Sequence, residues 1–153
     1  MHKITLVTIG RLKENWAREA CAFYADRLEH AVKLTIAELP ASRETDPLRQ
    51  VDDESRRLLK FIEDLDADVW VLDERGTALT SPAFAEIVAS AKDAGRAMLF
   101  LLGGSYGLND AVRAKGKRMR LSDMVLPHEL CRVVFLEQLY RAMEIAKGSG
   151  YHH

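Results

Sequence analysis

Short apolar runs alternate with longer segments of helical periodicity along the whole chain, and this alternation restricts the possible folds more than any other feature. Strands are expected at His2–Gly10, Lys33–Leu39, Asp68–Gly76, Arg96–Gly104 and near Lys117–Leu121. The runs VWVL (Val69–Leu72) and AMLFLL (Ala97–Leu102) are continuously apolar, which is typical of strands covered on both faces. The chain shows neither internal repeats nor a linker, so residues 1–153 are expected to form a single α/β domain.

Helices are expected between these strands, and several of their ends carry sequence signals. They should span about Glu14–His30, Pro47–Leu65, Ser81–Gly95 and Glu129–Ala146, with a short basic helix before the fifth strand. The pairs Asp46-Pro47 and Ser81-Pro82 each indicate an N-cap followed by proline, and Gly95 suits the position just after a helix. Apolar residues at near-helical spacing predict the buried faces of the first two helices: Trp16, Ala20, Phe23, Tyr24 and Leu28, then Leu48, Val51, Leu58, Leu59 and Ile62.

Composition excludes several classes of protein. No apolar run approaches the roughly 20 residues of a membrane helix, and MHKITLVTIG lacks a signal-peptide layout. Cys21 and Cys131 form no CxxC pair, and the histidines lack metal-ligand spacing. We therefore expect a cytoplasmic protein with neither a metal nor a membrane partner.

Charge is distributed unevenly although the formal net charge is only −1. Residues 1–110 hold fourteen Lys/Arg and nineteen Asp/Glu, whereas residues 111–153 hold eight and four, which is a net charge of +4. Five of the cations fall within RAKGKRMR, Arg113–Arg120. This segment is either a solvated helix end or a contact to a nucleic-acid backbone.

The fourth apolar run ends in a glycine-rich turn, LLGGSYGL (Leu101–Leu108). It matches neither a P-loop nor a dinucleotide-binding fingerprint, so it is either a plain tight turn or part of a ligand site. Ligands of open parallel sheets bind at the carboxyl ends of strands. Three such ends are expected to line up: Leu72–Glu74, Gly103-Gly104 and the loop after Leu121.

The last third of the chain carries the strongest signal. Leu121–Pro127 is a mostly apolar loop ending in proline, which could cover an adenine and offer backbone groups to its edge. His128 follows it at the start of the last helix, with Arg132 one turn further on. Glu137 and Arg141 form another such pair, which by itself is equally typical of a helix-surface salt bridge. Nearby apolar residues are expected in the core or a subunit interface: Leu130, Val133, Val134, Tyr140 and Met143.

The motifs FLLGGSYGL, LSDMVLPHELCRVVFLEQLYRAMEI and the terminal YHH together resemble the RlmH family of SPOUT-class methyltransferases. The resemblance extends from LVTIGRLK to the last residue. It implies an α/β fold with a mostly parallel sheet flanked by helices and a C-terminal trefoil knot, an exception to common topology rules. It also implies a homodimer that uses S-adenosylmethionine to methylate N3 of a pseudouridine in 23S ribosomal RNA of the assembled ribosome.

Carried over position by position, the resemblance implies two sets of site residues. The cofactor would lie against Leu72, Gly103, Ser122, Asp123, Met124, Val125, Leu126 and Pro127. The target nucleotide would lie among His128, Arg132, Arg141, Tyr151 and His152. In this interpretation a side chain at Gly103 would collide with the cofactor, His128 or His152 acts as the base, Tyr151 positions the nucleotide, and the two arginines hold phosphate or the developing anion.

The chain departs from the family pattern at its end, where GYHH replaces the usual PYHR. Gly150 should loosen the tail, and His153 removes a permanent cation. Ser105-Tyr106 replaces a more familiar Pro-Glu in the glycine turn. Three other interpretations remain: a SPOUT methyltransferase acting on transfer RNA, a non-catalytic ribosome-associated cofactor-binding protein, and an unrelated nucleotide-binding protein.

Overall fold

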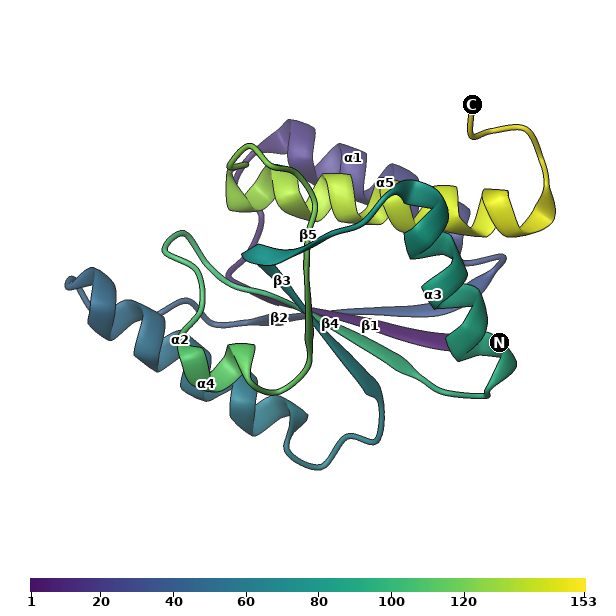
Figure 1. Cartoon of the computed structure of the whole chain (residues 1–153). Helices are drawn as coiled ribbons and strands as arrows, with labels where there is room; N and C mark the ends of the chain where they lie inside the picture. The colour runs from purple at the N-terminus through teal and green to yellow at the C-terminus, as the bar shows by residue number, and fades with distance from the viewer.

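The computed structural model describes residues 1–153 and contains five strands and five helices (Figure 1). In chain order they are β1 (His2–Ile9), α1 (Asn15–Leu28), β2 (Val32–Leu39), α2 (Pro47–Ile62), β3 (Asp68–Ala78), α3 (Ser81–Asp93), β4 (Met98–Leu102), α4 (Asp110–Arg113), β5 (Lys117–Arg120) and α5 (His128–Lys147). No helix is both long enough and apolar enough to cross a bilayer.

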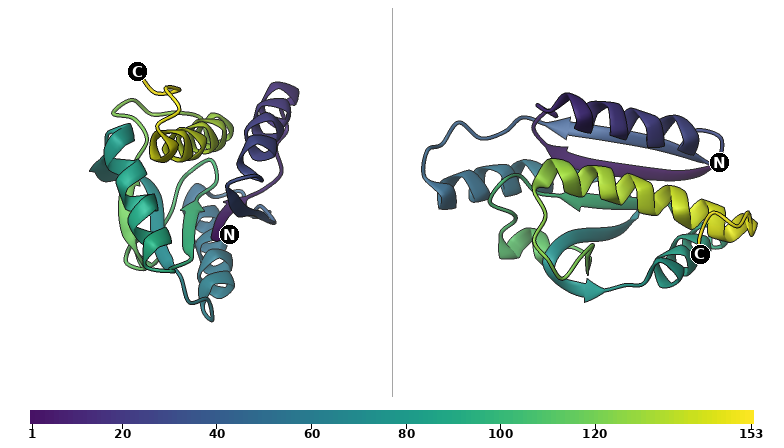
Figure 2. Two further views of the ribbon diagram at one scale, coloured as in Figure 1. Left: turned by 90° about the vertical axis from the view of Figure 1, so that its right-hand side faces the viewer. Right: turned by 90° about the horizontal axis from the view of Figure 1, so that it is seen from above.

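The strands form one sheet in the order β2-β1-β4-β3-β5, and every neighbouring pair is parallel. Helices α1, α3 and α5 cover one face, whereas α2 and α4 lie on the other (Figures 1 and 2). The expected α/β fold with helices on both faces of a parallel sheet is therefore confirmed. Because all strands run in one direction, their carboxyl ends meet at the same edge of the sheet.

The central strand β4 explains why its sequence is continuously apolar. Met98, Phe100 and Leu102 belong to the core under α1, α3 and α5, and the alternate residues Leu99 and Leu101 belong to the core under α2 and α4. All five side chains are buried. Side chains alternate across a strand, so a strand with helices on both faces needs apolar residues at every position.

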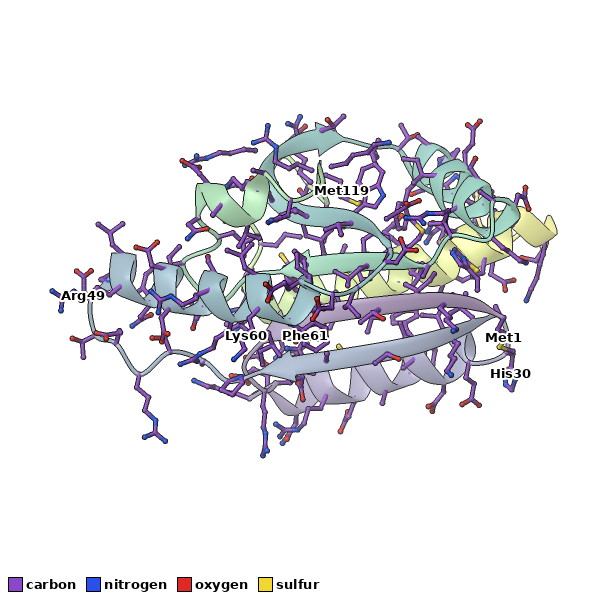
Figure 3. The ribbon with its side chains drawn as sticks, turned by 90° about the horizontal axis from the view of Figure 1, so that it is seen from below. Met1, His30, Arg49, Lys60, Phe61 and Met119 are labelled. Carbon is purple, nitrogen blue, oxygen red and sulfur yellow. The ribbon has the colours of Figure 1, made fainter.

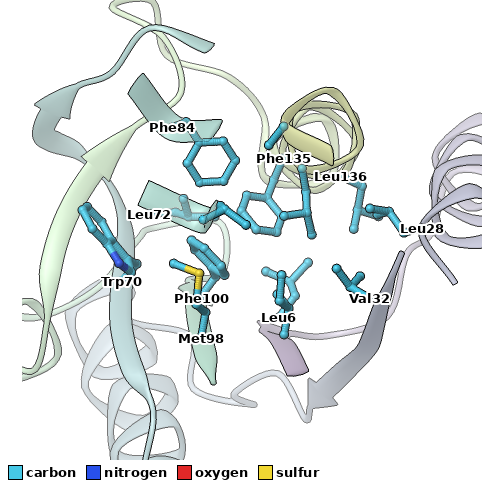
Figure 4. Close-up of a cluster of buried hydrophobic side chains, with 14 of the residues drawn as sticks. Leu6, Leu28, Val32, Trp70, Leu72, Phe84, Met98, Phe100, Phe135 and Leu136 are labelled. Atoms are coloured by element: carbon cyan, nitrogen blue, oxygen red, sulfur yellow. The ribbon is translucent and has the colours of Figure 1, made fainter. Parts of the chain in front are cut away.

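Three aromatic rings form the centre of the larger core (Figure 4). The ring centroids of Phe100 on β4 and Phe135 on α5 lie 4.7 Å apart. Phe84 of α3 lies 6.0 Å from the first ring and 6.2 Å from the second. This cluster joins α5 and α3 to the sheet and so fixes the position of the last helix.

Helix starts follow the predicted chemistry with one correction. Asp46 caps α2 by accepting a hydrogen bond from the Arg49 N–H at 3.1 Å, as expected. The predicted cap at Ser81 is wrong, because Thr80 accepts the bond from Ala83 N–H and caps α3. The Ser81 hydroxyl instead donates to Gln138 of α5 at 2.6 Å.

The predicted apolar faces of α1 and α2 are partly wrong. Trp16 and Phe23 are about half exposed. The buried residues of α1 are Ala17, Cys21 and Leu28. Leu28 was predicted, whereas Ala17 and Cys21 each lie one position after a predicted residue, Trp16 or Ala20. On α2, Leu48 is 77% exposed. The first turn of this helix projects beyond the sheet, as Figure 3 shows at the neighbouring residue Arg49.

The end of β3 crosses β5 in very close contact. The register between β3 and β5 shifts after Leu72, so that Leu72 and Thr77 both pair with Met119. A Cβ atom on Gly76 would lie 2.6 Å from the backbone of Met119, so only glycine permits this crossing. The chain therefore passes across itself just before residues 121–127. The trefoil knot stays a prediction.

We expect Phe135→Ala to lower the free energy of unfolding by about 3–5 kcal/mol, because it leaves a cavity between two rings in the core. Urea denaturation followed by circular dichroism measures this change. Leu48→Ala is the matched control, since an exposed side chain should change the free energy by less than about 0.5 kcal/mol. Equal losses in the two variants would contradict the assignment of the core.

Candidate functional site

A cavity of about 310 Å³ lies at the carboxyl ends of β3, β4 and β5. Its walls come from residues 72–75, 102–108, 120–122 and 124–126, together with Arg113, His128 and Cys131. The three strand ends that were expected to line up therefore do form one pocket. Its volume lies at the lower end of the range of small-molecule sites, which starts at roughly 300 Å³.

The glycine turn forms one wall of the pocket. Gly107 has a φ of +84° and donates its N–H to Gly104 C=O at 3.1 Å, which closes the turn. A Cβ on Gly103 would lie 2.9 Å from the carbonyl carbon and oxygen of Gly107 and from a methyl group of Leu108. The chain's own turn therefore already requires glycine at 103, and the expected collision with a cofactor stays a prediction.

The loop after β5 forms the opposite wall and exposes unpaired backbone groups to the pocket. Ser122, Met124, Val125 and Leu126 line the cavity. No backbone–backbone hydrogen bond involves residues 122–126. Only Met124 N–H, bonded to Ser122 Oγ, and Leu126 C=O, bonded to the Cys131 thiol, have side-chain partners there. The loop thus leaves N–H and C=O groups free to bind the edge of a flat heterocycle.

Two of the predicted cofactor residues lie outside the lining. Asp123 forms an ion pair with Arg120, with 2.8 Å between Oδ1 and Nε. Pro127 is exposed and immediately precedes α5. Both residues shape the loop, and neither contacts the cavity.

A buried ion pair forms the polar side of the pocket. Arg113 of α4 donates from Nε to Asp73 Oδ2 at 2.8 Å, and both side chains are largely buried. The other carboxylate oxygen accepts the backbone N–H of Arg75 at 3.3 Å. Sequence reasoning missed Arg113 as a pocket residue, because no sequence pattern pairs two positions 40 residues apart.

The start of α5 places His128 in the wall of the pocket. The next residue, Glu129, joins this end of the helix to the segment before α1. The carboxylate of Glu129 accepts the backbone N–H groups of Lys13 and Glu14 at 2.8 and 3.1 Å. Burial acts to raise the pKa of Glu129, but these two donors, together with the charges of His128 and Arg132, hold the pKa below its ordinary value.

Arg132, a predicted site residue, does not line the pocket. Its guanidinium is 2.6 Å from Glu38 Oε2 and donates to Gly10 C=O at 3.1 Å, and the residue is 3% exposed. These contacts join α5 to the ends of β1 and β2. The structure therefore shows Arg132 as an anchor one helical turn after His128.

The remaining predicted residues gather at the far end of α5, around Glu137. Arg141 Nη2 lies 2.6 Å from Glu137 Oε1, and the Tyr151 hydroxyl donates to the same oxygen at 3.1 Å. Burial, followed by this hydrogen bond, raises the pKa of Tyr151 to about 12, so the phenol stays protonated at neutral pH. His152 Nδ1 lies 3.2 Å from Arg141 Nη1 and must accept, because a guanidinium can only donate.

These two groups of residues lie far apart within one chain. Thirteen residues separate His128 from Arg141, and a helix rises about 1.5 Å per residue, so the two ends are about 20 Å apart. Figure 1 shows the C-terminus at the opposite end of α5 from the pocket loop, and the right-hand view of Figure 2 agrees. The structure therefore brings His128 to the pocket but leaves Arg141, Tyr151 and His152 away from it.

The lining of the pocket suits an adenosyl group. Leu72, Leu121 and Leu126 supply apolar walls, and the loop supplies free backbone donors and acceptors for a heterocycle. The structure holds no group of three or more His, Cys, Asp or Glu side chains placed to bind a metal. A parallel sheet with such a pocket at its strand ends defines a nucleoside-cofactor protein of the α/β class.

Comparison with known proteins specifies the family. The family described as "Predicted SPOUT methyltransferase" matches residues 2–152. Similar proteins named "Ribosomal RNA large subunit methyltransferase H" include those of Geotalea daltonii (34% identical, 99% of both chains), Alkalilimnicola ehrlichii (38%, 98% of both) and Nitratidesulfovibrio vulgaris (39%, 100% of both). This chain belongs to the SPOUT methyltransferase family, whose methyl donor is S-adenosylmethionine.

A solved structure supports the fold alone. The chain titled "Crystal structure of an hypothetical protein" superposes with a TM-score of 0.55 at 18% identity, covering 94% of this chain and 68% of that one.

We expect Gly103→Ala to lower the free energy of unfolding by about 1–3 kcal/mol, because the added methyl group meets backbone atoms of the turn. It should also weaken binding of S-adenosylmethionine, which titration calorimetry measures, because the turn must shift. Ser105→Ala, in the exposed part of the same turn, serves as the control. Unchanged stability and affinity in Gly103→Ala would show that the turn has room for a side chain.

The phenol of Tyr151 should titrate later than an ordinary tyrosine. In an ultraviolet absorbance titration we expect one phenol to ionise near pH 12, and Tyr151→Phe to remove that step. Because the protonated phenol is favoured in the folded state, its stabilising bond to Glu137 is complete below about pH 10 and is lost as pH rises to about 12. Glu137→Gln should lower the pKa of Tyr151. An unchanged titration in both variants would refute the contact.

Proposed function

We propose that this chain, acting as a single domain over residues 1–153, transfers a methyl group from S-adenosylmethionine to N3 of a pseudouridine in 23S ribosomal RNA of the assembled ribosome. The observation that carries the proposal is full-length similarity, at 33–39% identity, to proteins named ribosomal RNA large subunit methyltransferase H. The substrate lies in ribosomes, so the proposed location is the cytoplasm.

The different walls of the pocket would have different roles in the reaction. S-adenosylmethionine supplies an electrophilic methyl group, so the protein must orient the reactants, exclude water and remove a proton. Leu72, the turn at Gly103 and the loop Ser122–Leu126 would hold the adenosyl group. Asp123 and Pro127 would act indirectly by fixing the shape of that loop.

The imide N3 of a pseudouridine must lose its proton before it attacks the methyl group. His128 lies in the pocket wall and is the proposed general base. Tyr151 is unsuited to that role because its pKa of about 12 keeps it protonated. His152 accepts from Arg141 through Nδ1, so its other nitrogen carries a proton and would donate a hydrogen bond to the nucleotide.

The tail residues require a second copy of the chain to reach a pocket about 20 Å away. The face of α5 bearing Leu130, Val134, Glu137 and Arg141 is only half buried, and Met124 and Val125 beside it are each 79% exposed. Large exposed apolar side chains that adjoin a helix face are typical of an interface. We therefore propose a homodimer in which Arg141, Tyr151 and His152 of the partner subunit complete each pocket, while Arg132 anchors α5.

Methyl transfer from radiolabelled S-adenosylmethionine tests the function directly. Ribosomes from a strain lacking the protein should accept label in large-subunit RNA, whereas bulk transfer RNA should not. His128→Gln should lower kcat at least about 100-fold because it removes the base. The control is His30→Gln, which changes an exposed histidine far from the pocket.

Two results would contradict the proposal. Label in transfer RNA would favour a transfer-RNA methyltransferase. Intact binding of S-adenosylmethionine without any transfer would favour a non-catalytic ribosome-associated protein, and His153→Arg would then show whether the altered tail is the cause.

Mixing two inactive variants tests the shared site. His128→Gln damages the pocket side and Tyr151→Phe combined with His152→Gln damages the tail side. After subunit exchange, half of the dimers carry one intact site of two, so activity should return to about one quarter of the wild-type value. No recovery would show that each chain uses its own tail.

A further inference from the structure

A second groove, outside the cofactor pocket, follows the edge of the sheet where the end of β3 crosses β5. It measures about 360 Å³ and is lined by Trp70, Arg75, Gly76, Thr77, Leu79, Gly116, Lys117 and Arg118. Three of these residues are cations, and none is acidic. We refer to it as the edge groove.

The cations of the edge groove have no acidic partners within the chain. Arg75, Lys117 and Arg118 are exposed, and none forms a salt bridge. By contrast, Arg113 and Arg120 in the same basic segment pair with aspartates. The five cations of Arg113–Arg120 thus separate into structural ones and others free to bind an external anion.

The floor of the edge groove holds one of these cations in place. Lys117 Nζ lies 5.6 Å from the centroid of the buried Trp70 ring, which stands at the margin of the core cluster (Figure 4). Such a contact orients the ammonium group without neutralising its charge.

The walls of the edge groove are bare backbone with a hydroxyl group. Gly76 lies against the backbone of Met119, and Gly116 lies against the carbonyl of Val69, so close that neither position has room for a Cβ. Thr77 adds an exposed hydroxyl. Cations and hydroxyl groups contact phosphate and sugar in nucleic-acid complexes.

The edge groove opens next to the cofactor pocket, because Arg75 lines both cavities. We propose that the edge groove binds the sugar–phosphate backbone of the substrate RNA beside the nucleotide that enters the pocket. This inference rests on the proposed function. It assigns the basic segment a role in holding the RNA strand without reading its sequence, since phosphate contacts position a nucleic acid but do not specify bases.

The test compares two variants that each lose two positive charges. Lys117→Gln with Arg118→Gln removes two cations of the edge groove that do not line the pocket. Lys33→Gln with Arg43→Gln is the matched control, since both residues are exposed and lie on or just after β2, the opposite edge strand. Affinity for ribosomes and for protein-free 23S RNA is measured against salt concentration, without cofactor, alongside steady-state methyl transfer.

In the edge-groove variant, the slope of log affinity against log salt concentration should be shallower by about two, one for each lost phosphate contact. KM for ribosomes should rise about tenfold with kcat unchanged, because the phosphate contacts are equally strong in the ground state and in the transition state. Affinity for S-adenosylmethionine should stay constant. The control variant should behave as the wild type.

Equal slopes and affinities in the two variants would overturn the inference. So would an affinity loss confined to intact ribosomes, because the edge groove would then contact an acidic ribosomal protein instead of RNA. If the wild type binds ribosomes without methylating them, the proposed function fails, while the binding comparison still decides the role of the edge groove.

Discussion

The close crossing of β3 over β5 is the contact on which the C-terminal third of the molecule depends. Gly76 allows the backbone of one strand to lie directly against Met119 of the other. Residues 121–127 leave from that point and pass in front of the glycine turn. A bulkier residue at 76 would separate the strands and displace the wall of the pocket that carries the free backbone groups.

The last helix, α5, determines where the functional residues lie. Phe135 packs against Phe100 in the centre of the core, and the pair of Arg132 with Glu38 ties the helix to β2. These contacts hold His128 in the pocket wall. They also fix the direction of the helix, which places Arg141 about 20 Å from His128 along its axis. One rigid element thus sets both the local geometry of the pocket and the distance of the tail residues from it.

The sequence contained most of the fold but less of the site. The unbroken apolar run of β4 predicts a strand with helices on both faces, and Asp46-Pro47 predicts the start of α2, because both effects are local. The exposure of Leu48 depends on how far α2 projects beyond the sheet, which its own sequence does not encode. The role of Arg132 depends on a carboxylate 94 residues earlier, and no periodicity reveals such a contact.

We propose that the chain methylates N3 of a pseudouridine in the large-subunit RNA. The most direct measurement is nucleoside mass spectrometry of 23S RNA from ribosomes of a strain lacking this protein, before and after incubation with the purified chain and S-adenosylmethionine. We expect one methylated pseudouridine to appear in the RNA of assembled ribosomes, with the methyl group on N3. Methylation of another base or atom, or no new methylated nucleoside, would contradict it.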